Sequence, residues 1–182
     1  MSLAKMVIQR LQRWVLVMLT ALMVSGSAFA QTNLSGTINS YISVTGINIP
    51  VNALTLASVS GLNIGDTVFV IQMQGAVMNT TNTASFGNIV DPSTAGKYEF
   101  NVICDIIGNE ITLERNLLNA YNPASGVVQL IPVTIYENVN VTGNLTAQAW
   151  NGSTGGVIVL AAPDGYVSFG ADANATGPVS YT

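Results

Sequence analysis

The chain has 182 residues, of which 49% are hydrophobic and only 8% are charged, and it contains no histidine. The absence of histidine excludes the Ser–His and Cys–His nucleophile systems and the commonest zinc ligand. Cys104 is the only cysteine, so an intrachain disulfide is excluded as well. The fold must therefore depend on packing and hydrogen bonding.

Residues 1–30 have the three-part pattern of a bacterial-type secretory signal peptide. Three basic residues precede the apolar run 15–24, which is shorter than the ~20 residues that a membrane-spanning helix needs. Ala28-Phe29-Ala30 then gives a small-x-small cleavage pattern. We expect cleavage after Ala30, with an uncleaved amino-terminal helix as the alternative, and hence a secreted or cell-surface protein.

Cleavage would leave Lys97 and Arg115 against nine acidic residues, a net charge of 2 − 9 = −7. So few cations disfavour binding to nucleic acid or to an anionic membrane surface. Short β-branched runs and frequent turns predict an all-β protein. We expect two abutting domains, a small β-barrel or sandwich over residues 31–136 and the start of a β-solenoid, or β-helix-like segment, over residues 137–182.

The first predicted strands are Ile38 to Val44, ended by Gly46, then Leu54 to Val59 and Thr67 to Met73. In the turn before the last of these, Gly65 is suited to positive φ, and Asp66 is expected to bind backbone N–H groups just beyond it.

Gln72 and Gln74 alternate with Met73 and could present two amides to a ligand, although a half-buried strand with a polar outer face gives the same pattern. The polar segment 75–96 that follows is long enough to indicate a binding loop or a cover. Within it, Asp91 is expected to cap the backbone that follows.

A β-hairpin is predicted from Lys97 to Ile107 and from Glu110 to Leu113, joined by Gly108-Asn109. Within this hairpin, Cys104 is expected to be a buried, unreactive small hydrophobe. An apolar strand pair or bent strand broken at Pro132 is predicted over 127–136.

Short strands separated by Gly- or Asn-containing corners follow in the carboxy-terminal segment, the rhythm of a β-solenoid in which each rung buries apolar residues against the next. These predicted strands are 139–141, 145–147, 157–160 and 166–169.

The strings ALTLASVSGLNIGDTVFVIQMQGA, YEFNVICDIIGNEITLERNLLNAY and VVQLIPVTIYENVNV, with the later LTAQAWNGSTGGVIVLAA, resemble the amino-terminal region of large secreted or surface adhesin-like proteins of Bacteroidetes-type bacteria. In parts they also resemble the small β-barrel that precedes the β-helix in tail-fibre and polysaccharide-associated proteins. The first resemblance implies surface attachment, often type IX secretion, and no catalytic residues.

The residues themselves favour binding over catalysis. Two acid pairs are the candidates for glycosidase or lyase groups, but both fit strand faces or turns: Glu99 with Asp105, and Glu110 with Glu114. Trp150 could stack on a sugar ring, or it could be a core residue beside a turn. We therefore expect a non-catalytic, adhesin-like module with no metal or cofactor, glycans or cell surfaces as partners, and a fragment of a polysaccharide-degrading β-helix enzyme as the alternative.

Overall fold

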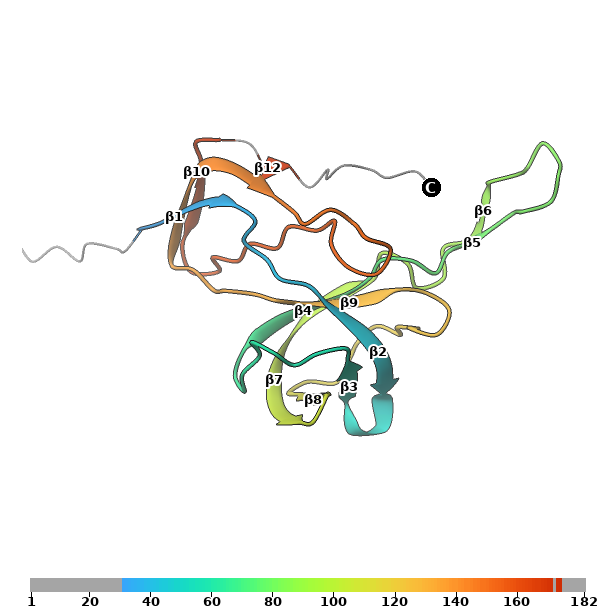
Figure 1. Cartoon of the computed structure of the whole chain (residues 1–182), viewed down its shortest axis with the longest axis horizontal. Coiled ribbons are helices and arrows are strands. Elements are labelled where there is room, and N and C mark those ends of the chain that lie inside the picture. The colour runs from blue at the N-terminus through green and yellow to red at the C-terminus, as the bar shows by residue number, and fades with distance from the viewer. Residues whose placement is uncertain (1–30, 172, 175–182) are drawn as a thin grey trace, which may run out of the picture. The chain divides into compact units, whose positions relative to one another are not determined.

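The computed structural model describes residues 31–171, 173 and 174, and the predicted signal peptide lies outside this range. Six antiparallel strands form a closed barrel (Figure 1), in the order β2 (Ile42–Asn48), β3 (Ala53–Leu56), β8 (Glu110–Leu113), β7 (Tyr98–Ile107), β4 (Thr67–Gln72) and β9 (Val128–Pro132). The predicted fold class, all-β with a small barrel, is confirmed. The only helical element of the described part is the single-turn 3-10 helix η1 (Ile49–Val51), and no helix there is long and apolar enough to cross a bilayer.

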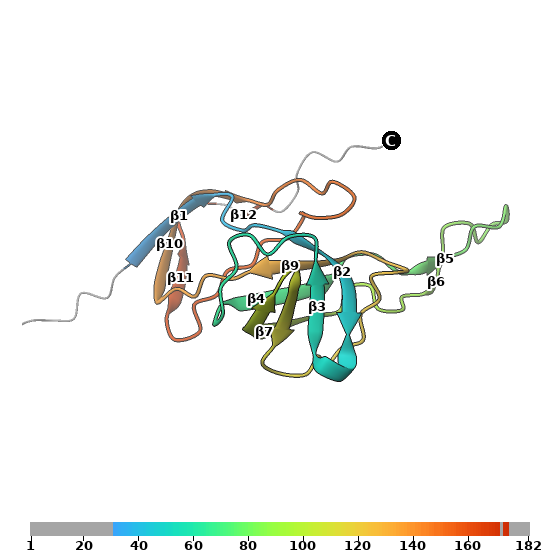
Figure 2. The same ribbon diagram turned by 60° about the horizontal axis from the view of Figure 1, so that its bottom comes forward.

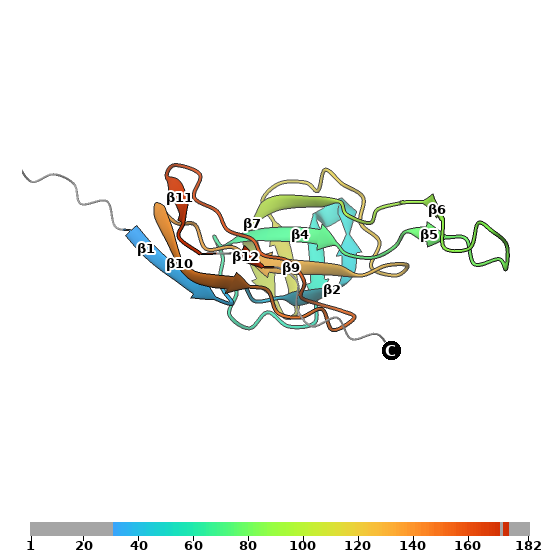
Figure 3. The ribbon, with the colours of Figure 1, turned by 90° about the horizontal axis from the view of Figure 1, so that it is seen from above.

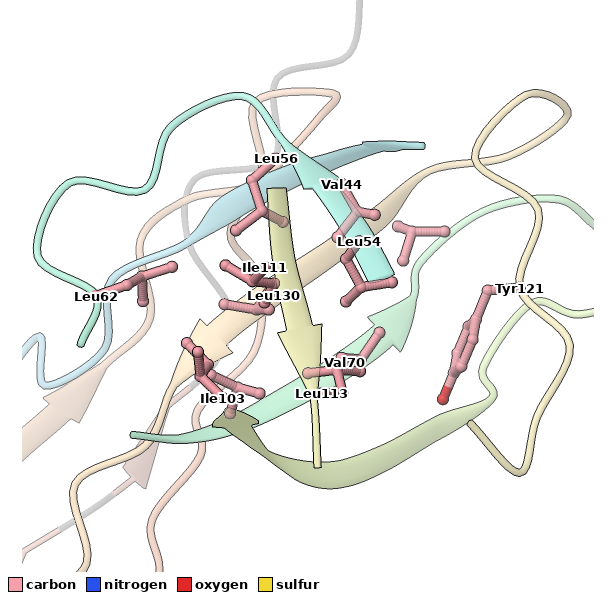
Figure 4. Packing of buried hydrophobic residues seen from close by; sticks show 12 residues of the cluster. Val44, Leu54, Leu56, Leu62, Val70, Ile103, Ile111, Leu113, Tyr121 and Leu130 are labelled. Atoms are coloured by element: carbon pink, nitrogen blue, oxygen red, sulfur yellow. The ribbon is translucent and has the colours of Figure 1, made fainter. Parts of the chain in front are cut away.

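Alternate residues of the barrel strands fill its interior, because successive side chains of a strand point to opposite faces. Figure 4 shows this packing, with the β-branched and leucine side chains of several strands converging on one centre. Burying each such side chain contributes about 1.5–3 kcal/mol. The core consists of Val44, Leu54, Leu56, Leu62, Val68, Val70, Ile103, Ile111, Leu113, Tyr121, Val128 and Leu130.

The first barrel strand differs from its prediction, because β2 begins four residues later and continues past Gly46. The pairing register with β3 shifts between Val44 and Gly46, so the glycine lies in a bulge instead of ending the strand. A Cβ at Gly46 would lie 3.1 Å from Thr55 Oγ1. The glycine thus permits close backbone approach inside a continuous strand.

The turn before β4 has the predicted glycine conformation, with Gly65 at φ +92°. The predicted direction of the Asp66 hydrogen bond was wrong, however. Asp66 Oδ2 accepts from the backbone N–H of Asn63, at 2.8 Å, three residues before it rather than after it. The carboxylate therefore closes the turn, and Gly65 N–H joins the turn to the barrel by donating to Ile103 O at 2.8 Å.

A parallel sheet forms beside the barrel from both ends of the described chain (Figure 2). We call it the parallel stack, and it comprises β1 (Gln31–Gly36), β10 (Asn138–Thr146), β11 (Tyr166–Phe169) and β12 (Ala173–Asn174). The two strands predicted at 139–141 and 145–147 are one strand, β10. The domain boundary at residue 136 stays a prediction, and β1, which precedes the barrel in the chain, pairs with the stack.

The strand predicted at 157–160 was wrong, because this segment is extended but pairs only through a single bridge at Ala161. Asn39 replaces the missing ladder by binding both the N–H and the carbonyl of Val159, each at 2.8 Å. Val157 and Val159 pack on the barrel, whereas Ile158 and Leu160 pack on the stack. The run is apolar because both of its faces are covered.

The long polar segment 75–96 is a protruding ribbon, which we call the arm (Figure 3). Its two short strands, β5 (Val77–Met78) and β6 (Ile89–Asp91), pair only with each other. The predicted cap is confirmed, since Asp91 Oδ1 accepts from Ser93 N–H at 2.7 Å. The prediction for Cys104 was wrong, because this residue is exposed: it lies in the bulge between Ile103 and Asp105.

Candidate functional site

A cluster of aromatic rings lies on the outer face of the barrel. Phe69 of β4 packs against Tyr98 and Phe100 of β7, with ring centroids 5.3 Å and 4.9 Å apart. The strand register places Phe69 opposite Phe100, and Ile71 opposite Tyr98. All four side chains share one face because they occupy alternate positions on neighbouring strands.

The two rings of β7 are largely accessible to solvent, whereas the ring beneath them is not. Tyr98 is 59% exposed and Phe100 46%, but Phe69 is only 7% exposed because Ile131 and Val159 pack against it. Large aromatic side chains held side by side at a surface, on a rigid base, indicate a contact surface for a ligand.

Trp150 lies close to the same face. It is half-buried in the loop 148–156 that crosses the end of β4. A Cβ at Gly156 would lie 3.7 Å from Trp150 Cβ and 3.8 Å from Met73 Cε, so both side chains lie next to this glycine. We call this set the aromatic face; it consists of Phe69, Ile71, Met73, Tyr98, Phe100 and Trp150.

The loop that carries Trp150 is fixed to the barrel by a buried amide. Gln129 of β9 is fully buried, donates to Gly155 O at 3.0 Å and accepts from Gly155 N–H at 2.8 Å. Gly155 has φ +106°, and a Cβ there would lie 2.6 Å from Ala149 O, so no other residue fits this position without a shift. The indole is therefore held on an ordered loop.

The two glutamines singled out from the sequence have opposite environments. Gln72 is fully buried and points into the barrel, where its amide binds Gln74 O at 2.8 Å and the backbone N–H of Asn122 at 2.8 Å. Gln74 is exposed. Gln72 thus has no free amide for a ligand in this structure, and only Gln74 can offer one.

Gln72 belongs to a polar layer at one end of the barrel interior. Asn101 and Asn52 both bind the backbone carbonyl of Arg115, at 2.7 and 2.6 Å. The carboxylate of Glu99 accepts from the backbone N–H groups of Leu118 and Asn119, each at 3.0 Å. These inward-facing side chains hold the loop 114–126 across the barrel end, so their role is structural.

Tyr121 in this loop has a buried hydroxyl that points toward β7 (Figure 4) and has no hydrogen-bond partner among the described residues. Burial, and then the neighbouring Glu99 carboxylate, raise the pKa of Tyr121 well above its ordinary value. The hydroxyl stays protonated at any physiological pH, so it supplies no base.

Neither acid pair forms a convergent site. Glu110 begins β8 and Glu114 follows it, four residues or about 13 Å along a strand. Glu99 and Asp105 are six residues apart on β7, or about 20 Å along a strand. Glu99 is used in the barrel end, and Asp105 accepts from the N–H of the next residue, Ile106. Within the part of the chain that the structure describes, no three acidic or cysteine side chains gather to hold a metal ion.

Tyr98 and Phe100 were not identified as candidates from the sequence. A signal was present in the string Tyr-Glu-Phe-Asn at 98–101, where aromatic and polar residues alternate. The ordinary expectation is that the aromatic side chains point inward. In this strand the aromatic side chains point outward instead, because Glu99 and Asn101 point inward and bind the loop 114–126.

Comparison with known proteins finds no matching family model and no matching curated protein. Three solved structures are similar, all of them phage tailspikes. The tailspike of Acinetobacter baumannii bacteriophage AP22, solved in complex with A. baumannii capsular saccharide, is 12% identical with a TM-score of 0.36 over 64% of this chain and 19% of that one. Those of Pseudomonas phages LKA1 and phi297 are each 18% identical, with TM-scores of 0.34 and 0.35 over 66% and 67% of this chain and 21% and 18% of theirs.

The chain thus spans about a fifth of the length of these tailspikes. The resemblance to the barrel of tail-fibre proteins and the resemblance to Bacteroidetes-type adhesins both stay predictions. At such TM-scores, the role of each residue depends on the geometry described above.

Proposed function

We propose that this chain is a non-catalytic binding module of a secreted or cell-surface, adhesin-like protein, and that its aromatic face contacts polysaccharide. The observation that carries the proposal is the exposure of Tyr98 and Phe100, side by side and supported by the buried ring of Phe69. A pyranose ring has an apolar face that packs on aromatic rings, and its hydroxyl groups need polar neighbours.

Polar groups lie beside the aromatic rings. Lys97 precedes Tyr98 and is exposed, and Asn119 donates from its amide to Tyr98 O at 3.1 Å. Gln74 is exposed just beyond the end of β4. Lys97 and Gln74 are the exposed polar residues next in the chain to Tyr98 and Met73, whereas the amide of Asn119 is already bound to Tyr98 O and to Glu99.

A matched pair of tyrosine variants tests this contact. Tyr98 and Tyr166 are exposed to similar extents, 59% and 54%, but Tyr166 lies on the stack. Binding of laminarin, xylan, galactomannan and alginate to residues 31–182 is measured by affinity electrophoresis and calorimetry. We expect Tyr98→Ala to weaken binding to the best of these polysaccharides about 5- to 10-fold, the size of one lost aromatic contact, and Tyr166→Ala to leave it unchanged.

Trp150→Ala is expected to weaken the same binding while circular dichroism shows an intact fold. Equal loss for Tyr98→Ala and Tyr166→Ala would contradict the placement of the site. Absence of binding to every polysaccharide and to whole cells would leave a scaffold role in place of a binding one. Release of reducing ends from any of the polysaccharides would contradict the non-catalytic assignment.

A further inference from the structure

The parallel stack has two outer strands, β1 and β11. Leu34, Val141 and Phe169 form one column across β1, β10 and β11. Val141 in the middle strand is fully buried, whereas Phe169 at the end of the column is 60% exposed. Among residues 31–171, 173 and 174, no strand pairs with the outer edge of β11 or with that of β1.

Both edges lack the features that normally prevent pairing with another chain. Proteins block such edges with charged side chains or proline. β1 has the sequence QTNLSG and β11 the sequence YVSF, so neither strand contains a charged residue or a proline. The two edges lie on opposite sides of β10, and all three strands run in the same direction.

We propose that the outer edge of β11 binds β1 of a second copy of this chain in parallel, so that copies associate head to tail. The joint would use the edge of β1 that faces away from β10, and it would continue the parallel pairing that already joins β1, β10 and β11 within one chain. Phe169 would lie beside Leu34 of the next copy, on the side of Leu34 opposite to Val141, and the exposed ring would be covered.

A second column, of polar residues on the opposite face of the stack, would also continue across the joint. It consists of Asn33, Asn140 and Ser168. Asn140 donates from its amide to Asn33 Oδ1 at 3.4 Å within the chain, and Ser168 occupies the next position of that column. In the proposed joint, Ser168 lies beside Asn33 of the second copy. Because the two surfaces are different, the association is not closed by a two-fold axis and extends to chains of copies.

Disulfide trapping tests this register. Within one chain β10 separates Asn33 from Ser168 by two strand spacings, about 9.6 Å, which is too far for a disulfide. Asn33→Cys and Ser168→Cys are introduced in separate chains of residues 31–182 that carry Cys104→Ser. We expect a covalent dimer when the two variants are mixed and mildly oxidised, and monomers when each variant is oxidised alone.

The control mixes Ser168→Cys with Asn109→Cys, an exposed position in the hairpin turn of the barrel. This mixture is expected to stay monomeric, and circular dichroism confirms that each variant is folded. The proposal is overturned if the Asn33→Cys and Ser168→Cys mixture stays monomeric at the highest soluble concentration. Cross-linking of the control mixture at the same rate would overturn it as well.

Discussion

At the scale of single residues, Gln72 is the clearest case of a polar side chain with a structural role. Gln72→Ala would leave the buried N–H of Asn122 and the carbonyl of Gln74 without their side-chain partner and create a cavity. We expect a loss of about 2–4 kcal/mol of unfolding free energy. Urea unfolding is followed through Trp150, the only tryptophan after residue 30.

The neighbouring glutamine provides the control for this measurement. Gln74 is exposed, so Gln74→Ala is expected to change the unfolding free energy by less than about 0.5 kcal/mol. Similar losses for the two variants would contradict the assignment of Gln72 to the barrel interior.

Tyr121 is expected to lower the free energy of unfolding at alkaline pH. Its pKa in the folded chain is raised above the ordinary value of 10.0, first by burial and then by Glu99. Below pH 10 the hydroxyl is protonated in both states and has no effect; above it, the unfolded chain releases the proton first. Between pH 10 and the folded-state pKa of Tyr121, the free energy of unfolding therefore falls by up to about 1.4 kcal/mol per pH unit from this group.

Tyr121→Phe removes this alkaline pH dependence of stability, together with a buried hydroxyl that lacks a hydrogen-bond partner. We expect the variant to be within about 1 kcal/mol of the wild type at pH 7, or more stable, and to resist alkaline unfolding better. Urea midpoints measured at neutral pH and above pH 10 check both statements. An equal alkaline loss in the two proteins would exclude Tyr121 as the cause.

At the scale of elements, the arm and the loop 114–126 differ in what they contribute to the barrel. The strands of the arm pair only with each other, whereas the loop is held by Gln72, Glu99 and Asn101. Replacing residues 78–89 by Asn-Gly is expected to cost less than about 1 kcal/mol. Replacing residues 116–124 in the same way is expected to cost several times more, since buried polar groups lose their partners.

Thermal unfolding of the two deletion variants compares them directly. A large loss of stability on shortening the arm would show that it packs on the barrel in solution. The small loss that we expect for the arm agrees with the exposure of its large apolar side chains, which are Val77, Met78, Phe86, Ile89 and Val90.

The extended segment 157–161 depends on side-chain hydrogen bonds in place of a sheet ladder. Asn39→Ala would remove both bonds to Val159, and we expect a loss of about 2 kcal/mol together with faster amide exchange at that residue. Asn33→Ala, at an exposed position on β1, is the control. Unchanged exchange at Val159 would contradict the role of Asn39.

The sequence predicted those elements whose signals are local. β4, the hairpin of β7 and β8, and β11 lie at or close to their predicted bounds, because turn residues such as Gly65 and Gly108 mark their ends. The segment 157–160 was predicted as a strand because an apolar run buried between two layers has the composition of one. The local alternation of residues also could not indicate that Tyr98 and Phe100 point outward. Which side chains of β7 point inward is determined by hydrogen bonds to a loop some twenty residues away.

At the scale of the whole molecule, strand order is what the sequence could not provide. β2 pairs with β9 and β1 with β10, so the closing contacts of barrel and stack join opposite ends of the chain. The barrel leaves no free edge and needs no disulfide, whereas the outer edges of β1 and β11 are unpaired in the part of the chain that the structure describes. Trp150 was found from the sequence as a lone aromatic residue beside a turn, and only the fold places it beside Gly156, which also lies next to Met73.

The most direct test of polysaccharide binding by the aromatic face is a backbone amide and indole NMR titration. Labelled residues 31–182 are titrated with the polysaccharide of the panel that binds best, fragmented to oligosaccharides. The account predicts shift changes confined to β4, β7 and the loop 148–156, including the Trp150 indole. Changes confined to the arm or to the parallel stack would contradict it.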